Sequence, residues 1–230
     1  MFCKKGGITV DNNFKGNERI LHHSLPVRLF HWCLVLGFLP AGFTGVILFF
    51  RPFGEAGMHL AMQVHIVGAW ILMIACTLFF FLCPGRVVAF WREAFHWTKQ
   101  DIEWMKVGGG YPQKMIFLHE IEVPPMGKIN SGQKMMGIMV FFGTLLIMLT
   151  GAVLYFALPL VPKEIAYYAD LIHLVVGMGL FLCVCGGHIP LGIYNWPEFR
   201  SMFGDGTLNA QHAAHHHPLW TKHEIEKVKD

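Results

Sequence analysis

The chain has 230 residues, of which 54% are hydrophobic and 14% are charged, and its mean hydropathy is +0.45. This composition is far from that of a soluble domain. The formal net charge of +3 is small and indicates no nucleic-acid partner.

Four apolar runs are each long enough to cross a bilayer, which takes a helix of about 20 residues. They cover residues 29–50, 60–83, 135–157 and about 165–189. The first run is too long for the apolar part of a signal peptide, and no small-residue cleavage site follows it. We therefore expect an all-α integral membrane four-helix bundle. Residues 1–28 precede the bundle and a tail, residues 190–230, follows it.

The basic residues predict how these helices are oriented. Of the 18 Lys and Arg residues, only Arg51 and Lys163 lie in the loops after the first and third runs. The others lie in the N-terminal segment, the long central loop or the C-terminal tail. Because cytoplasmic loops carry an excess of Lys and Arg, we expect both termini and the central loop to be cytoplasmic. The chain is thus predicted to cross the bacterial inner membrane four times, among membrane lipids.

The central loop begins with an aromatic-rich segment, residues 85–106, which contains Trp91, Trp97 and Trp104. Its pattern predicts an amphipathic helix at the membrane interface. The six cysteines of the chain form no CxxC or CxxCH pattern. They therefore predict neither an iron–sulfur cluster nor a covalently attached haem. We expect the cysteines to be small, buried apolar side chains.

Four histidines lie inside the apolar runs, where an imidazole is costly and indicates a functional site. In the predicted topology, His31 and His188 lie near the cytoplasmic face, and His65 and His173 lie near the outer face. Only these two pairs match in depth. Each pair can supply both axial nitrogens of one six-coordinate haem inside the bundle. We therefore predict two non-covalently held b haems, with these four histidines as iron ligands.

His173 and His188 are fifteen residues apart on one apolar run. That spacing corresponds to roughly 22 Å along a helix, but it leaves the two side chains about 60° out of register. Gly186 and Gly187 precede His188, and Pro190 follows it. A local bulge or kink at this point could re-aim His188.

The sequence resembles the membrane-anchoring cytochrome b (gamma) subunit of respiratory formate dehydrogenase. The resemblance covers nearly the whole chain from residue 26. The elements that carry it are RLFHW (28–32), QVHIVG (63–68), KINSGQKMM (128–136), DLIHLVVG (170–177) and HHPLWTKHEIEK (216–227). NSGQKMM is the most specific of them, because scattered histidines also suit the cytochrome b subunits of hydrogenases and thiosulfate reductases.

The resemblance implies a protein with two bis-histidine haems that passes electrons to quinone, either menaquinone or ubiquinone. The donor is expected to be an iron–sulfur beta subunit at the outer face, attached to a molybdopterin or tungstopterin catalytic alpha subunit. No catalytic residue for substrate oxidation is expected in this chain, and a higher oligomer is possible. The resemblance also implies that Asn130 and Gly132 bind quinone beside the inner-haem histidine, His188. For Asn130, an ordinary helix cap is the alternative.

Several other residues have two readings. Arg28 can pair with a haem propionate or anchor the interface. Asp170 can orient His173 or simply stabilise a helix N-terminus. The closely spaced histidines of residues 212–217 suggest metal binding. We favour the alternative, in which these histidines make contacts of the cytoplasmic tail. The alternative functions are the cytochrome b subunit of a nickel–iron hydrogenase or of another molybdopterin oxidoreductase and, more distantly, a transporter with histidine proton relays.

Overall fold

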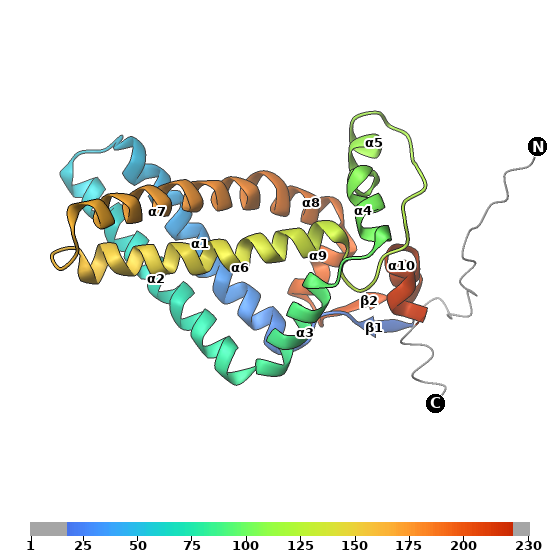
Figure 1. Ribbon diagram of the computed structural model, residues 1–230. Helices are drawn as coiled ribbons and strands as arrows, with labels where there is room; N and C mark the ends of the chain where they lie inside the picture. Colours follow the sequence, from blue (N-terminus) through green and yellow to red (C-terminus); the bar gives the residue numbers. More distant parts are fainter. Residues whose placement is uncertain (1–17, 223–230) are drawn as a thin grey trace, which may run out of the picture.

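Within residues 18–222, which the computed structural model describes, four long apolar helices are able to cross a membrane. They are α1 (Leu25–Phe50), α2 (Glu55–Leu82), α6 (Ser131–Ala152) and α7 (Lys163–Cys183). α1 packs along α2, α6 packs along α7, and α1 also contacts α7. Figure 1 shows these four helices as the body of the molecule. The four predicted spans are therefore confirmed.

Two of the long helices continue through wider π-helical turns. The turns are η2 (Val153–Ala157), which extends α6, and η3 (Val184–His188), which joins α7 to α8 (Ile189–Tyr194). The fourth span is thus one continuous helix over residues 163–194. It runs beyond residue 189, where the sequence placed the end of the fourth span.

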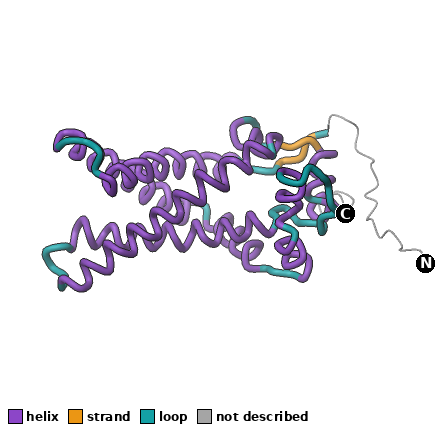
Figure 2. The backbone as a smooth tube through the Cα atoms, turned by 90° about the horizontal axis from the view of Figure 1, so that it is seen from above, coloured by secondary structure: helices purple, strands orange, loops and turns teal. Residues whose placement is uncertain are grey.

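The smaller elements gather at one end of the bundle. They are β1 (Arg19–Leu21), α3 (Pro84–Phe95), α4 (Lys99–Lys106), η1 (Gly108–Gly110), α5 (Tyr111–Met115), α9 (Trp196–Phe203), β2 (Thr207–Asn209) and α10 (Ala210–His216). We call this the capped end. The opposite end, which we call the loop end, carries the short α1–α2 and α6–α7 connections (Figures 1 and 2). Both limits of the described chain lie at the capped end, as four membrane crossings require.

The surface of the bundle is apolar, while small residues line its helix contacts. Leu36 and Phe81, for example, are 63% and 73% exposed. A Cβ atom on Gly68 would lie 2.7 Å from the carbonyl oxygen of Gly37, so α1 and α2 meet backbone to backbone. This pattern is typical of membrane helices, whose association depends on close packing because lipid removes the hydrophobic drive between them.

The amphipathic segment of the central loop differs from the prediction. One helix over 85–106 was expected, but the chain forms two, α3 and α4. The side chain of Thr98 accepts a hydrogen bond from the backbone N–H of Asp101, and the Asp101 carboxylate accepts one from the backbone N–H of Thr98. This reciprocal capping box starts a new helix and therefore breaks the segment.

The tail folds back onto the start of α1. β1 and β2 pair antiparallel, with Ile20 opposite Leu208, and the Arg28 guanidinium donates to the Gly204 carbonyl. The Trp32 indole donates to the Met202 carbonyl at 3.0 Å. Arg28 therefore ties α1 to the tail. This contact was not foreseen in either reading of that residue.

Candidate functional site

The two histidines predicted near the outer face meet inside the bundle. His65 of α2 and His173 of α7 face each other with ring centroids 6.0 Å apart and an interplanar angle of 68°. Both side chains are half-buried. They come from helices in different hairpins, so this pair joins the α1–α2 and α6–α7 halves of the bundle.

The two histidines predicted near the cytoplasmic face also meet. His31 of α1 and His188 of η3 have ring centroids 6.2 Å apart, with an interplanar angle of 52°. His173 and His188 lie on one continuous helix, roughly 22 Å apart along its axis by the α-helical rise. The structure therefore brings together both pairs that the sequence matched by depth.

The π-helical turn explains how His173 and His188 can be fifteen positions apart and still lie on the same face of their helix. A π-helical turn accommodates one residue more than an α-helical turn. With η3 absorbing the extra residue, the spacing is equivalent to fourteen α-helical residues, which ends about 40° short of whole turns rather than 60° beyond them. Gly186 and Gly187 lie inside this turn. The bulge expected beside His188 is therefore confirmed.

Each pair leaves room for a metal ion between its two imidazoles. A metal–imidazole nitrogen bond is about 2.0 Å long, so two bonds in line, plus the distance from nitrogen to centroid in each ring, come to about 6 Å. The observed separations of 6.0 and 6.2 Å match this sum. Both pairs therefore fit bis-imidazole ligation of a haem iron. The two histidines of each pair would hold the haem iron, and the iron would supply one-electron redox chemistry.

Hydrogen bonds hold both histidines of the outer pair. The Nδ1 atom of His65 lies 2.8 Å from the carbonyl oxygen of Ala41 and 3.4 Å from Oγ1 of Thr44. The Nδ1 atom of His173 lies 3.1 Å from Oγ1 of Thr150. Neither threonine was singled out in the sequence. Asp170, for which orientation of His173 was one of two interpretations, is exposed, and an orienting contact to His173 comes from Thr150 of α6.

The inner pair lacks such a contact at His31. Its Nδ1 atom is buried without a hydrogen-bond partner among the described residues. The His31 ring packs edge-on against the Trp32 ring, with centroids 5.4 Å apart. The two pairs therefore differ in what orients their rings, although their spacing is nearly the same.

Asn130 caps α6. Its side-chain oxygen accepts a hydrogen bond from the backbone N–H of Gln133 at 2.9 Å, and the Gln133 side-chain oxygen accepts one from the backbone N–H of Asn130 at 2.8 Å. The structure therefore assigns Asn130 the capping role that was the alternative to quinone binding. Because the cap uses only the oxygen, the side-chain NH₂ is the group that can donate to another molecule.

Gly132 lies against the indole of Trp104. A Cβ atom at this position would come within 3.0 Å of Cη2 of Trp104, which is tighter than ordinary van der Waals contact. The close approach of α4 to α6 therefore accounts for the glycine by itself. Quinone binding at Gly132 stays a prediction.

A buried ion pair fixes the start of α6 to α4. Lys134 Nζ lies 2.9 Å from the Asp101 carboxylate, and the two side chains are 7% and 3% exposed. Ser131 donates to the same carboxylate at 2.9 Å. Although burial favours the neutral acid, hydrogen bonds from Lys134, Thr98 and Ser131 hold the pKa of Asp101 at about 2. Two residues of the NSGQKMM element, Ser131 and Lys134, thus have a structural partner in α4.

The tail histidines form a polar cluster at the capped end. His217 lies 3.0 Å from the Glu198 carboxylate and 2.8 Å from the Gly127 carbonyl oxygen. Although burial opposes the charged form, contacts with His212 and His217 lower the pKa of Glu198. Burial and the neighbouring His23 lower the pKa of His22 to about 3. His217 thus makes the kind of contact that was expected of the tail histidines, joining α9 to the central loop.

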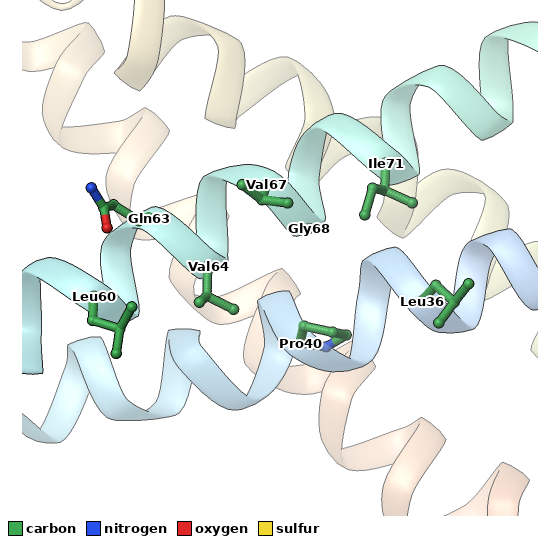
Figure 3. A pocket seen from close by; sticks show the side chains of 8 residues that line it. All are labelled: Leu36, Pro40, Leu60, Gln63, Val64, Val67, Gly68 and Ile71. Carbon is green, nitrogen blue, oxygen red and sulfur yellow. The ribbon is translucent and has the colours of Figure 1, made fainter.

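An apolar groove on the surface of the bundle contains no histidine. It follows the seam between α1 and α2 with a volume of about 410 Å³, and its lining residues include Pro40, Val64 and Gly68. Gln63 supplies its polar side chain (Figure 3). Without a metal-binding or titratable group, this groove offers no redox chemistry, so the histidine pairs are the candidate site.

The chain is similar to known proteins over most of its length. The family model described as prokaryotic cytochrome b561 matches residues 22–205, which include all four histidines. The chain is 27% identical over 216 residues to the formate dehydrogenase cytochrome b556 subunit of Haemophilus influenzae, covering 91% of this chain and 85% of that protein. It is 25% identical over 214 residues to the nitrate-inducible formate dehydrogenase cytochrome b556(Fdn) subunit of Escherichia coli K12, covering 88% and 89%.

Proposed function

The chain belongs to the prokaryotic cytochrome b561 family, and from that membership we propose that it is the cytochrome b subunit of a formate dehydrogenase. Membership of the family implies haem b as the cofactor. The similarity to two formate dehydrogenase cytochrome b556 subunits extends over most of each chain. It therefore supports formate dehydrogenase over the other complexes that use a histidine-ligated cytochrome b.

We propose two b haems, one held by His65 and His173 and the other by His31 and His188. The observation that carries this proposal is the presence of two histidine pairs with nearly equal spacing, 6.0 and 6.2 Å, at two depths of one bundle. Two one-electron centres stacked in this way would connect an electron donor at the loop end with quinone at the capped end.

Haem stoichiometry tests this proposal. The purified chain is expected to contain two acid-extractable b haems per polypeptide. Its reduced-minus-oxidised spectrum should be that of low-spin haem. His173→Ala and His65→Ala should each remove one haem, and His31→Ala and His188→Ala should each remove the other. His59→Ala, which replaces a histidine outside both pairs, is the matched control and should retain two haems. One haem in the wild-type chain, or two haems in His173→Ala, would contradict the assignment.

The donor is proposed to be an iron–sulfur subunit attached to a pterin-containing formate dehydrogenase subunit. No residue of this chain is assigned to formate oxidation, so that reaction belongs to a partner. Intact mass spectrometry of the complex purified from its own membrane identifies the partners. Recovery of a nickel–iron hydrogenase large subunit in place of a pterin subunit would reassign the donor and leave the haem proposal unchanged.

We also propose that quinone binds at the start of α6, near Asn130 and His188. The family resemblance supports this placement, and the side-chain NH₂ of Asn130 supplies a hydrogen-bond donor suited to a quinone carbonyl. In this proposal, Asn130 has two roles, since its oxygen caps α6 while its nitrogen binds quinone.

A further inference from the structure

The same local arrangement occurs twice around the outer histidine pair. On α1, Thr44 is followed by Gly45, and both lie beside His65 of α2. On α6, Thr150 is followed by Gly151, and both lie beside His173 of α7. Each histidine is thus supported by a threonine–glycine pair on the other helix of its own hairpin.

The threonine hydroxyls have already used their protons. Thr44 Oγ1 donates to the Pro40 carbonyl at 2.6 Å, and Thr150 Oγ1 donates to the Leu146 carbonyl at 2.7 Å. A hydroxyl has one proton, so toward a histidine each of these oxygens can only accept. His65 therefore carries its proton on Nδ1, which lies 2.8 Å from the Ala41 carbonyl oxygen, and we assign the proton of His173 to Nδ1 in the same way.

The glycines make room for the rings that these bonds orient. A Cβ atom on Gly151 would lie 3.0 Å from Cε1 of His173, which is closer than ordinary contact. A Cβ atom on Gly45 would lie 3.5 Å from Cε1 of His65. A side chain at position 151 would therefore push the His173 ring away from Thr150.

We propose that Thr44 and Thr150 are positioning residues for the outer haem, which fix both ligands with Nδ1 protonated and Nε2 facing the iron. This inference deepens the proposed function and rests on the proposed haem between His65 and His173. A hydrogen bond from Nδ1–H makes an imidazole more basic as a ligand, which favours the oxidised iron and lowers its reduction potential. Since Nδ1 of His31 has no partner in the described residues, the outer haem should have the lower potential of the two. This order favours electron transfer from the loop end toward the capped end.

The test is Thr150→Val in the purified complex, with optical redox titration and low-temperature electron paramagnetic resonance of the haems. Valine keeps the shape of threonine and removes the acceptor. The outer haem should become easier to reduce, with its reduced-to-oxidised ratio at a fixed ambient potential rising several-fold, and its low-spin resonance should shift. Thr150→Ser should restore both values. Thr44→Val should shift the outer haem in the same direction, since each histidine also has a backbone carbonyl partner, Ala41 for His65 and Ile147 for His173.

Two matched controls separate positioning from packing. Thr144→Val replaces another buried threonine of α6 and should leave both haems unchanged. Gly151→Ala should displace His173 and broaden or shift the outer-haem resonance, whereas Gly179→Ala, whose Cβ would meet nothing within 4 Å, should not. Loss of the outer haem in Thr150→Val but not in Thr150→Ser or Thr144→Val also supports the proposal.

Wild-type potential and resonance in Thr150→Val would overturn the positioning role. That failure is distinct from failure of the haem site itself, which would appear as two retained haems in His173→Ala. Haem identity is assigned from the histidine variants, so a change confined to the inner haem would also overturn the inference.

Discussion

At the scale of single residues, Asn130 combines a structural role with a proposed functional one. Its oxygen is the N-cap acceptor of α6, and its amide nitrogen is the proposed quinone donor. Asn130→Asp separates the two, because aspartate caps helices as well as asparagine does but has no N–H to donate when ionised. We expect this variant to retain stability and both haems while the reoxidation of the haems by quinone slows, as measured by stopped-flow spectroscopy in membranes.

Asn130→Ala provides the comparison. It removes both roles, so it should lower stability by about 1 kcal/mol through loss of the cap and slow reoxidation as well. Wild-type reoxidation in Asn130→Asp would leave Asn130 as a cap alone. Gly132 is a poor probe of the quinone pocket, because a larger side chain there would first meet Trp104.

At the scale of elements, the π-helical turn η3 determines where His188 points. Deleting Gly187 should convert this turn to ordinary α-helix and leave His173 and His188 fourteen positions apart instead of fifteen, the α-helical equivalent of the present spacing. We expect the variant to retain the inner haem, measured as two haems per polypeptide with an unchanged inner-haem spectrum.

Insertion of one alanine after Gly179 is the opposite change. It should rotate His188 by about 100° relative to His173, because η3 already contains the extra residue. The inner haem should then be lost while the outer haem stays, since His173 precedes the insertion. Equal haem content in both variants would show that η3 does not control the register.

The sequence predicted the spans from long apolar runs, and it predicted the pairing of the histidines from the depth of each one in its run. It also pointed to a bulge beside His188, since fifteen residues do not fit an α-helical repeat and two glycines lie at the discrepancy. It did not predict Thr44 and Thr150, because a threonine inside an apolar run is ordinary. The recurrence of Thr-Gly in the first and third spans was the available signal. The pairing of Lys134 with Asp101 depends on how α4 packs, which no local pattern determines.

At the scale of the whole molecule, the unequal ends of the bundle make its orientation testable. Lys163 is exposed at the start of α7, and it is the lysine expected at the loop end. Lys99, Lys106 and Lys114 belong to the capped end and are also exposed. If the positive-inside distribution holds, an amine reagent that cannot cross membranes should label Lys163 only from the outside and the other three only from the cytoplasmic side.

The same lysine reports where the electron donor docks. The outer histidine pair lies toward the loop end, so a donor that reaches it should cover the α6–α7 connection. Labelling of Lys163 from outside should therefore be strong in the chain expressed alone and reduced in the intact complex, where an amine cross-linker should join it to the iron–sulfur subunit. Lys163→Arg removes the label and serves as the control. Cross-links to the donor from Lys114 but not from Lys163 would place the donor at the capped end, and electrons would then enter at His31 and His188.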